Sequence, residues 1–449
     1  MDDTNSSRKK TISLIAENGV PVPDFPVYPK PELLIPAGGI ETLKVAIDYG
    51  ADAVYIGGSS FGLRAKADNF TRIEMEEGLK YAHDRGKKVY VTVNIFAHNY
   101  DLDGIRAYFK DIKDLKIDAL LISDPGIFMI AREELPDMEI HISTQANNTN
   151  YMTYRFWHEM GAKRVVAARE LSLAELKQIR ENIPEDLEIE AFVHGAMCIS
   201  YSGRCLLSNY FTGKDANHGA CTHPCRWKYS VVESTRPGEY LPVEEDDRGT
   251  YIFNSKDLCM VDKIPDLINS GIQSLKVEGR MKTNLYVAAA ARTYREAIDY
   301  YYADPAVYIK KCSHYLKEIS MCTIRDFTRG FYYGKPSAED QIYNNNTYFQ
   351  NAVYMGKIEE ITENGEIVIY QKNKFSKGDK IECMLFDGAK GENENNNLTF
   401  SVISIKDEYG NELESAPHPK QKLFIGFKIE SDSAEKPEPG MILRLRESI

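Results

Sequence analysis

The chain has 449 residues, of which 43% are hydrophobic and 27% are charged, and its formal net charge is −12. This length accommodates two or three domains with a large hydrophobic core, and the acidic excess argues against a protein that coats nucleic acids nonspecifically. No apolar run is long enough to cross a bilayer, so we expect no membrane-spanning helix and no membrane partner.

The first 30 residues combine a basic pair with only a short apolar segment, which does not match a secretory signal. We interpret residues 1–30 as an N-terminal arm outside the main fold. We therefore expect a cytoplasmic protein whose thiols are kept reduced.

From residue 31 onward, short apolar runs alternate with amphipathic stretches. The apolar runs predict strands at Glu32–Ala37, Ala53–Gly57, Lys88–Asn94, Ala119–Ser123, Glu139–Thr144, Arg164–Ala168, Glu188–Val193 and Ser274–Val277. The other stretches predict helices at Thr42–Tyr49, Arg72–Arg85, Asp103–Asp114, Ile127–Glu134, Tyr151–Met160, Ser172–Ile183 and Tyr286–Tyr302. Eight such units predict a TIM-like (β/α)8 barrel over residues 31–330. An open doubly wound sheet is the alternative, and the lack of a G-x-G-x-x-G fingerprint after any strand favours the barrel.

The pattern changes after Arg329. We interpret residues 331–350, which include three consecutive asparagines at 344–346, as a linker. Residues 351–449 contain apolar residues that alternate at period two between turns rich in Gly, Asp and Asn, which predicts a small antiparallel β-barrel of five to seven strands. Such barrels bind RNA or dock against another domain, and the absence of an aromatic and basic stacking motif favours docking.

A cysteine-rich insertion, residues 196–260, separates the seventh and eighth predicted strands. It carries five of the eight cysteines, namely Cys198, Cys205, Cys221, Cys225 and Cys259. Disulfides suit small secreted domains, and a zinc knuckle fits only the Cys221–Cys225 pair. An iron–sulfur cluster takes four thiolates at looser spacings, whereas a radical-SAM triplet is excluded because Lys228 stands where its third cysteine belongs. A cluster is therefore favoured over buried cysteines that act as small apolar residues.

Polar residues follow the ends of several predicted strands, where TIM barrels place their chemistry. The candidate catalytic residues are Asp124, Arg169, Glu170, His194, Glu278 and Arg280, and Asn94 and Gln145 occupy similar positions. Each has a plainer explanation, such as a turn at Asp124-Pro125-Gly126 or an Arg169–Glu170 ion pair. The cysteine-rich insertion also begins at a strand end, so we expect it to cover the mouth of the barrel.

Several motifs resemble the collagenase-like peptidase family U32. They are Glu190-x-Phe192-x-x-Gly195-Ala196-Met197-Cys198, Ser202-Gly203-x-Cys205-x-Leu207-Ser208, Cys221-Thr-His-Pro-Cys225-Arg-Trp, Asn254-Ser-Lys-Asp257, Lys276-Val-Glu-Gly-Arg280, Pro31-Glu-Leu-Leu-Ile-Pro-Ala-Gly38 and Ala53-Val-Tyr-Ile-Gly57. The resemblance extends over nearly the whole chain from residue 30. The family was named for proteolysis, but several members resemble oxygen-independent hydroxylation proteins that carry an iron–sulfur cluster. Their substrates are a tRNA wobble uridine, a ribosomal RNA cytidine or a ubiquinone precursor.

The long single-module form with this cysteine set is most similar to the tRNA uridine branch. The resemblance therefore implies an enzyme that forms 5-hydroxyuridine in the tRNA anticodon loop with a prephenate-derived hydroxyl donor. It also implies a 4Fe–4S cluster on Cys198, Cys205, Cys221 and Cys225, with Cys259 as the alternative fourth ligand. A second protein of the same family is a further candidate partner, and we expect no DNA partner.

Basic and aromatic residues in and around the cysteine-rich insertion are of the types that contact RNA. Possible contacts to phosphates are Arg204, Lys214, Arg226, Lys228, Lys276, Arg280 and Lys282, and possible contacts to a base are Tyr201, Tyr210, Phe211, Trp227 and Tyr229.

Two other functions compete with hydroxylation: proteolysis, and a noncatalytic RNA-binding scaffold with a structural cluster. Proteolysis lacks support, because no H-E-x-x-H motif occurs. The G-x-S-x-G sequence at Gly58–Gly62 is not followed by the strong helix that a nucleophile elbow needs.

Overall fold

The computed structural model describes residues 28–58, 61–62, 69–198, 200–201, 204–227, 254–322, 325–336, 340–342, 352–386, 397–430 and 435–446. Most of the predicted N-terminal arm and of the predicted linker lies outside these ranges, as do Lys228 and Tyr229.

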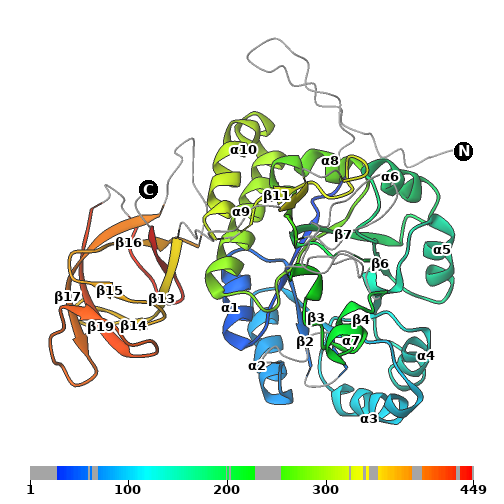
Figure 1. Cartoon of the computed structure of the whole chain (residues 1–449), viewed down its shortest axis with the longest axis horizontal. Coiled ribbons are helices and arrows are strands. Elements are labelled where there is room, and N and C mark those ends of the chain that lie inside the picture. Colours follow the sequence, from blue (N-terminus) through cyan, green and yellow to red (C-terminus); the bar gives the residue numbers. More distant parts are fainter. Residues whose placement is uncertain are drawn as a thin grey trace, which may run out of the picture.

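Eight parallel strands form a closed barrel at the centre of the larger domain (Figure 1). They are β1 (Glu32–Pro36), β2 (Ala53–Gly57), β3 (Lys88–Val93), β4 (Ala119–Ile122), β5 (Ile140–Ile142), β6 (Arg164–Val166), β7 (Glu188–Ala196) and β10 (Ser274–Val277). Strand β10 pairs with both β1 and β7 and so closes the barrel. The strands are almost wholly buried because helices cover their outer side, which explains their continuous Val, Ile and Leu runs. The predicted TIM-like barrel is confirmed.

Helices surround the barrel (Figure 1). They are α1 (Ile40–Asp48), α2 (Arg72–His83), α3 (Leu102–Ile112), α4 (Pro125–Glu134), α5 (Tyr151–Glu159), α6 (Leu173–Glu181), α8 (Ile264–Asn269), α9 (Asn284–Ala303) and α10 (Pro305–Ser320). Ser172 caps α6 together with Glu175, and Thr71 and Glu74 form the same capping box on α2. Among the described residues, none of the helices has the length and apolarity needed to span a bilayer.

Short strands and a short helix lie at the mouth of the barrel. Strand β9 (Asp257–Cys259) runs antiparallel to the end of β7, and β11 (Phe327–Thr328) extends that pairing. The cysteine-rich insertion contains the short helix α7 (Leu207–Thr212), and β8 (Asn254–Ser255) pairs with β12 (Gln341–Ile342). The sequence analysis predicted neither β9 nor α10.

The C-terminal domain is a closed barrel of six antiparallel strands with a hydrophobic core of its own, which confirms the prediction. Its strands are β13 (Ala352–Ile361), β14 (Ile367–Tyr370), β16 (Lys380–Met384), β17 (Leu398–Asp407), β19 (Lys422–Ile429) and β20 (Ile442–Arg446). A small two-stranded antiparallel sheet, β15 (Phe375–Ser376) and β18 (Ser415–Ala416), packs on the same core.

A buried polar network joins the two barrels. Glu318 on α10 bonds Arg292 on α9 at 3.1 Å and Arg444 on β20 at 2.9 Å. The Tyr49 hydroxyl donates to the Met384 carbonyl at 2.7 Å. Both arginines are buried, so Glu318 neutralises cations that solvent does not reach. The contact supports docking as a role of the C-terminal barrel.

We expect Glu318→Ala to loosen this contact, because it leaves Arg292 and Arg444 buried with less compensating charge. Removing one partner of a buried pair costs on the order of 3–5 kcal/mol. Thermal unfolding should start at a lower temperature, and limited proteolysis should separate the two barrels sooner. An exposed pair serves as control: Glu133→Ala, which removes a contact to Arg106 at the surface, should change neither result. Equal proteolysis of both variants would contradict the docking role.

Candidate active site

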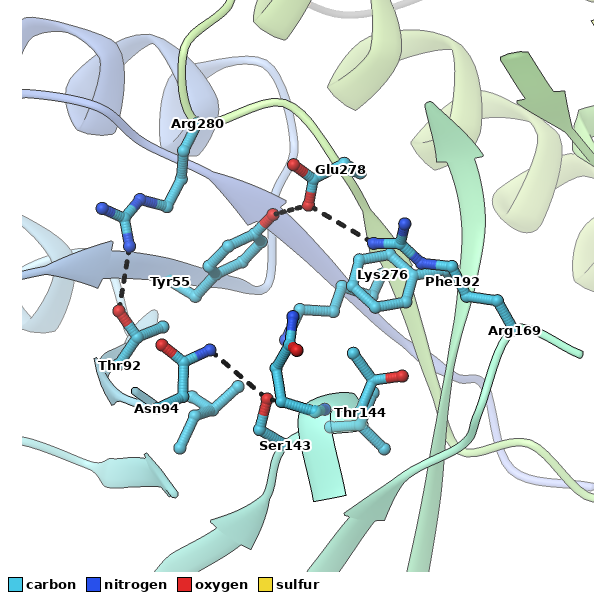
Figure 2. A pocket seen from close by; sticks show the side chains of 13 residues that line it. Tyr55, Thr92, Asn94, Ser143, Thr144, Arg169, Phe192, Lys276, Glu278 and Arg280 are labelled. Atoms are coloured by element: carbon cyan, nitrogen blue, oxygen red, sulfur yellow. Dashed lines mark hydrogen bonds and ion pairs between the residues drawn. The ribbon is translucent and has the colours of Figure 1, made fainter. Parts of the chain in front are cut away.

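A cavity at the carboxyl end of the barrel strands opens to solvent, and together with its open mouth it encloses about 490 Å³. Figure 2 shows its lining. The residues are Tyr55, Thr92, Asn94, Leu121, Ser143, Thr144, Gln145, Val166, Arg169, Phe192, Lys276, Glu278 and Arg280. Three of them are cationic and one is anionic, so the cavity suits a ligand with negative charge.

Arg169, which follows β6, is fixed on one side of the cavity. Its Nη1 donates to the Ala196 carbonyl at 3.0 Å, its Nη2 lies 3.7 Å from Glu278 Oε2, and its guanidinium lies 4.0 Å from the centroid of the Phe192 ring. Among the described residues, no acceptor faces the buried Nε of Arg169. The side chain is therefore held in place at the wall of the cavity.

Arg280, on the other side, reaches the cavity past the end of β2 (Figure 2). Its Nη1 donates to Thr92 Oγ1 at 2.9 Å and its Nη2 to Asn69 Oδ1 at 3.0 Å. A Cβ atom at Gly57 would lie 2.4 Å from the Arg280 guanidinium, so only glycine leaves room for this side chain. Gly195, at φ +105°, makes similar room for the Glu278 carbonyl, where a Cβ would lie 2.5 Å away. Gly57 and Gly195, which belong to two of the motifs that resemble family U32, thus permit the placement of Arg280 and Glu278.

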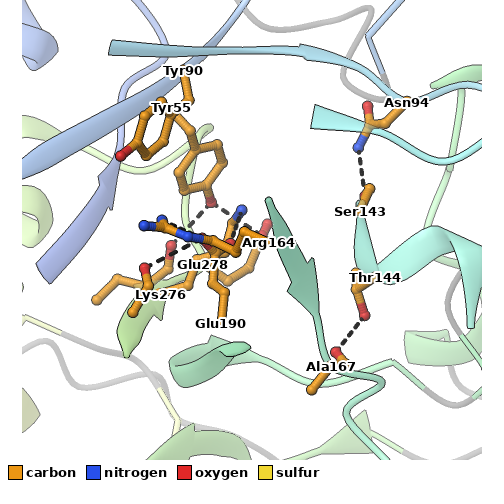
Figure 3. Close-up of polar contacts among 12 residues, drawn as sticks. Tyr55, Tyr90, Asn94, Ser143, Thr144, Arg164, Ala167, Glu190, Lys276 and Glu278 are labelled. Atoms are coloured by element: carbon orange, nitrogen blue, oxygen red, sulfur yellow. Dashed lines mark hydrogen bonds and ion pairs between the residues drawn. The ribbon is translucent and has the colours of Figure 1, made fainter. Parts of the chain in front are cut away.

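A network of charges lies inside the barrel beneath the cavity (Figure 3). Lys276 Nζ bonds Glu190 Oε1 at 2.7 Å, and Arg164 Nη1 bonds Glu190 Oε2 at 3.1 Å and Glu32 Oε1 at 2.5 Å. The Tyr90 hydroxyl completes it by donating to Glu32 Oε2 at 2.7 Å. Arg164 also bonds Glu188 Oε2 at 2.6 Å, so two cations face three carboxylates, and Lys276 connects this network to the cavity above it.

The network holds its carboxylates ionised. Burial raises the pKa of Glu190, but the charges of Lys276 and Arg164 outweigh it, so the pKa lies below the ordinary value of 4.5. The pKa of Glu32 is lowered in the same way, because the charge of Arg164 outweighs burial. Burial also lowers the pKa of Lys276, but its 2.7 Å bond to the Glu190 carboxylate favours the charged form.

These shifts predict a loss of stability in acid. A carboxylate whose pKa is lowered by folding contributes stability that is complete above its unfolded value and disappears as pH falls through its folded value. We therefore expect the free energy of unfolding to fall as pH drops below about 4.5. Urea unfolding across this range should show a shallower pH dependence in Glu190→Gln than in the native chain. Parallel curves would mean that Glu190 does not titrate as described.

The other three candidate residues lie outside the cavity lining. Asp124 caps α4, because its carboxylate accepts from the Ile127 N–H at 3.0 Å. Glu170 is half-buried, and burial raises its pKa. His194 is buried among the rings of Tyr286, Tyr294 and Phe327, and burial lowers its pKa to about 3. We therefore restrict the proposed site to the residues that line the cavity, of which Arg169, Glu278 and Arg280 were predicted as catalytic candidates.

The sequence analysis missed several lining residues, chiefly Tyr55, Thr92, Ser143 and Phe192. The strand sequences do contain a signal for the residues that face the barrel interior. Residues two apart on one strand face the same side, so Phe192 faces the barrel interior with Glu190. A charged residue inside an otherwise apolar strand therefore indicates which face lines the barrel.

The cysteine-rich insertion is attached to the cavity rim. The Phe96 N–H donates to the Asn217 carbonyl at 3.3 Å, and His218 Nε2 lies 2.7 Å from the Phe96 carbonyl oxygen. Phe96 follows β3 two residues after Asn94, which lines the cavity. The expected position over the barrel mouth is thus supported by direct contacts to its rim.

The cysteines fit an iron–sulfur cluster in kind and number. Cys198 is exposed, Cys205, Cys221 and Cys225 are half-buried, and Cys259 is buried on β9. The His223 N–H donates to Cys221 Sγ at 3.4 Å, a contact that stabilises a thiolate and tunes cluster potentials. Among the described residues, no three His, Cys, Asp or Glu side chains are placed to hold a metal ion. The fit therefore depends on the donor set and not on an assembled coordination sphere.

Comparison with known proteins identifies the family. The model of peptidase family U32 matches residues 38–342, and that of its C-terminal domain matches residues 350–444. The chain is 42% identical to tRNA hydroxylation protein P1 of Bacillus subtilis, over 89% of this chain and 92% of that protein. It is 37% identical to tRNA hydroxylation protein P of Escherichia coli, over 86% and 92% of the two chains. An uncharacterized protease of Methanocaldococcus jannaschii is 43% identical over 67% of this chain and 73% of its own. The chain therefore belongs to peptidase family U32.

Proposed function

We propose that this chain hydroxylates the wobble uridine of tRNA to 5-hydroxyuridine without molecular oxygen. The observation that carries the proposal is a cationic cavity bordered by a cysteine-rich insertion, in a chain similar over most of its length to tRNA hydroxylation proteins. The partner is the tRNA anticodon loop, whose unpaired bases can leave their stack and enter a pocket at low cost. A second protein of the same family is a further proposed partner, and the site of action is the cytoplasm.

The cluster ligands in this proposal are Cys198, Cys205, Cys221 and Cys225, with Cys259 as the alternative fourth. A 4Fe–4S cluster supplies one-electron chemistry when it is bound. The cysteine-rich insertion is attached to the cavity rim through Phe96, which supports a role in chemistry within the cavity. A purely structural cluster would gain nothing from this position.

The cavity is the proposed site for the reactants. Arg169 and Arg280 are placed to bind the carboxylate of an anionic, prephenate-derived donor, since guanidinium groups pair with carboxylates through two parallel hydrogen bonds. Glu278 lies between them in the view of Figure 2 and is the carboxylate available for proton transfer. Phe192 and Leu121 supply apolar wall for a ring.

The peptidase alternative has less support. A serine or threonine nucleophile needs an adjacent base. The Asn94 amide donates to Ser143 Oγ, the Thr144 hydroxyl donates to the Ala167 carbonyl, and no histidine lines the cavity within the described residues. Ser60 of the G-x-S-x-G sequence lies outside the described ranges.

The proposal is tested by deleting the gene and measuring tRNA nucleosides by mass spectrometry in cells grown without oxygen. We expect 5-hydroxyuridine and its derivatives to disappear, and a plasmid copy to restore them. Normal levels in a deletion strain that has no second family member would refute the assignment. Gelatin cleavage by pure protein that is lost on a single cavity substitution, such as Glu278→Gln, would favour the peptidase instead.

A further inference from the structure

We infer that His98 and Tyr100, on the loop between β3 and α3, form a stacking platform for an unpaired RNA base next to the cavity. The inference rests on the proposed function for the class of ligand, and it assigns RNA recognition to residues that no motif identified. We call the rings of His98, Tyr100 and His218 the aromatic platform.

The platform rings are arranged like stacked bases. The His98 and Tyr100 rings are almost parallel, with an angle of 3° and a centroid separation of 5.3 Å. His218 meets His98 edge-on at 5.1 Å and 71°. Tyr100 is 75% exposed, so its ring contributes little to the hydrophobic core. Aromatic surfaces left open in this way serve nucleic-acid-binding proteins as places where bases continue a stack.

The platform is held rigid by hydrogen bonds. The His98 N–H donates to Asp101 Oδ2 at 2.7 Å, and the Asp101 N–H donates to the His98 carbonyl at 2.9 Å. His218 Nε2 lies 2.7 Å from the Phe96 carbonyl oxygen and 3.6 Å from Asp101 Oδ2. The Asp101 carboxylate is therefore occupied by contacts within the platform. Preorganised rings lose little conformational entropy when a base stacks on them.

The position of the platform points to RNA that also enters the cavity. Asn94 lines the cavity, and His98 follows four residues later, a span of at most about 14 Å. The Arg204 guanidinium lies 6.0 Å from the ring of Phe96, a residue between Asn94 and His98 in the chain, where it can meet a phosphate. His218 belongs to the cysteine-rich insertion, so the platform joins the two loops that border the cavity. A base stacked here would neighbour the one that is turned into the cavity.

The inference is tested with a fluorescent hairpin copy of the anticodon arm and the full-length protein. We expect Tyr100→Ala to weaken hairpin binding by roughly 5- to 100-fold, because stacking on one aromatic side chain contributes that much affinity. Tyr100→Phe keeps the ring and should bind as the native chain does. Tyr409→Ala is the matched control, because Tyr409 is 81% exposed but lies in the C-terminal barrel domain.

The outcomes separate the platform from the proposed function. Weaker binding by Tyr100→Ala alone, with thermal unfolding unchanged, supports the platform. Native affinity in Tyr100→Ala would overturn the platform and leave tRNA hydroxylation standing. Hairpin binding undetectable in the native chain would overturn both.

Discussion

Replacing Cys205 with alanine is expected to remove the iron–sulfur cluster and to abolish tRNA hydroxylation. Three thiolates cannot supply the four protein ligands of a closed 4Fe–4S cluster. Anaerobically purified native protein should be brown and contain on the order of four iron and four sulfide per chain, whereas Cys205→Ala should be nearly colourless. The variant should also fail to restore 5-hydroxyuridine in the deletion strain.

Cys312→Ala is the matched control for this prediction. Cys312 lies on α10, where its thiol donates to the Tyr308 carbonyl at 3.4 Å, away from the cysteine-rich insertion. This variant should keep its iron and its activity. Comparing Cys225→Ala with Cys259→Ala decides the fourth ligand, since only one of them should lose iron as fully as Cys205→Ala. Colourless native protein with stoichiometric zinc would refute the cluster.

Replacing Glu190 with alanine should cause a large loss of stability. The Glu190 side chain is wholly buried and lies between Lys276 and Arg164 at 2.7 and 3.1 Å. Its removal leaves the buried Lys276 without the carboxylate to which it is hydrogen-bonded, and we expect the free energy of unfolding to fall by about 3–5 kcal/mol. Denaturant unfolding at neutral pH measures the change. Any folded fraction should bind an anionic donor less tightly, because Lys276 is then free to move.

Glu77→Ala is the control for Glu190→Ala. Glu77 pairs with Lys44 at 2.8 Å, but its side chain is 53% exposed, so solvent screens the pair. Little change in unfolding is expected. Equal effects of the two substitutions would show that the barrel interior tolerates an unpaired lysine, and the role assigned to this network would be wrong.

Much of the fold could be predicted because parallel strands buried on both faces are continuous apolar runs, as in Ala53–Gly57 and Ala119–Ile122. Helix α10 was missed, although Asp304 as N-cap and Pro305 as the first helical residue are start signals. Arg444 breaks the apolar alternation of strand β20. That arginine is buried because Glu318 and Glu382, both far away in the sequence, neutralise it.

The site was less predictable than the fold. The cysteine spacing and the strand ends indicated the barrel mouth, and Arg169, Glu278 and Arg280 do line the cavity. Asp124 also follows the end of a strand, but its carboxylate caps helix α4 and does not line the cavity. Which strand-end side chain points inward depends on the local register, and β10 shifts register against β7 between Lys276 and Val277. The platform was missed because its rings come from loops more than 100 residues apart.

The most direct test of the account uses tRNA from the deletion strain, an oxygen-free, gel-filtered extract of that strain, and added cluster-replete protein. We predict that 5-hydroxyuridine forms at the wobble position when prephenate is supplied, and that it does not form when Cys205→Ala replaces the native protein. Equal product with both proteins, or none with the native protein while gelatin is cleaved, would contradict the account.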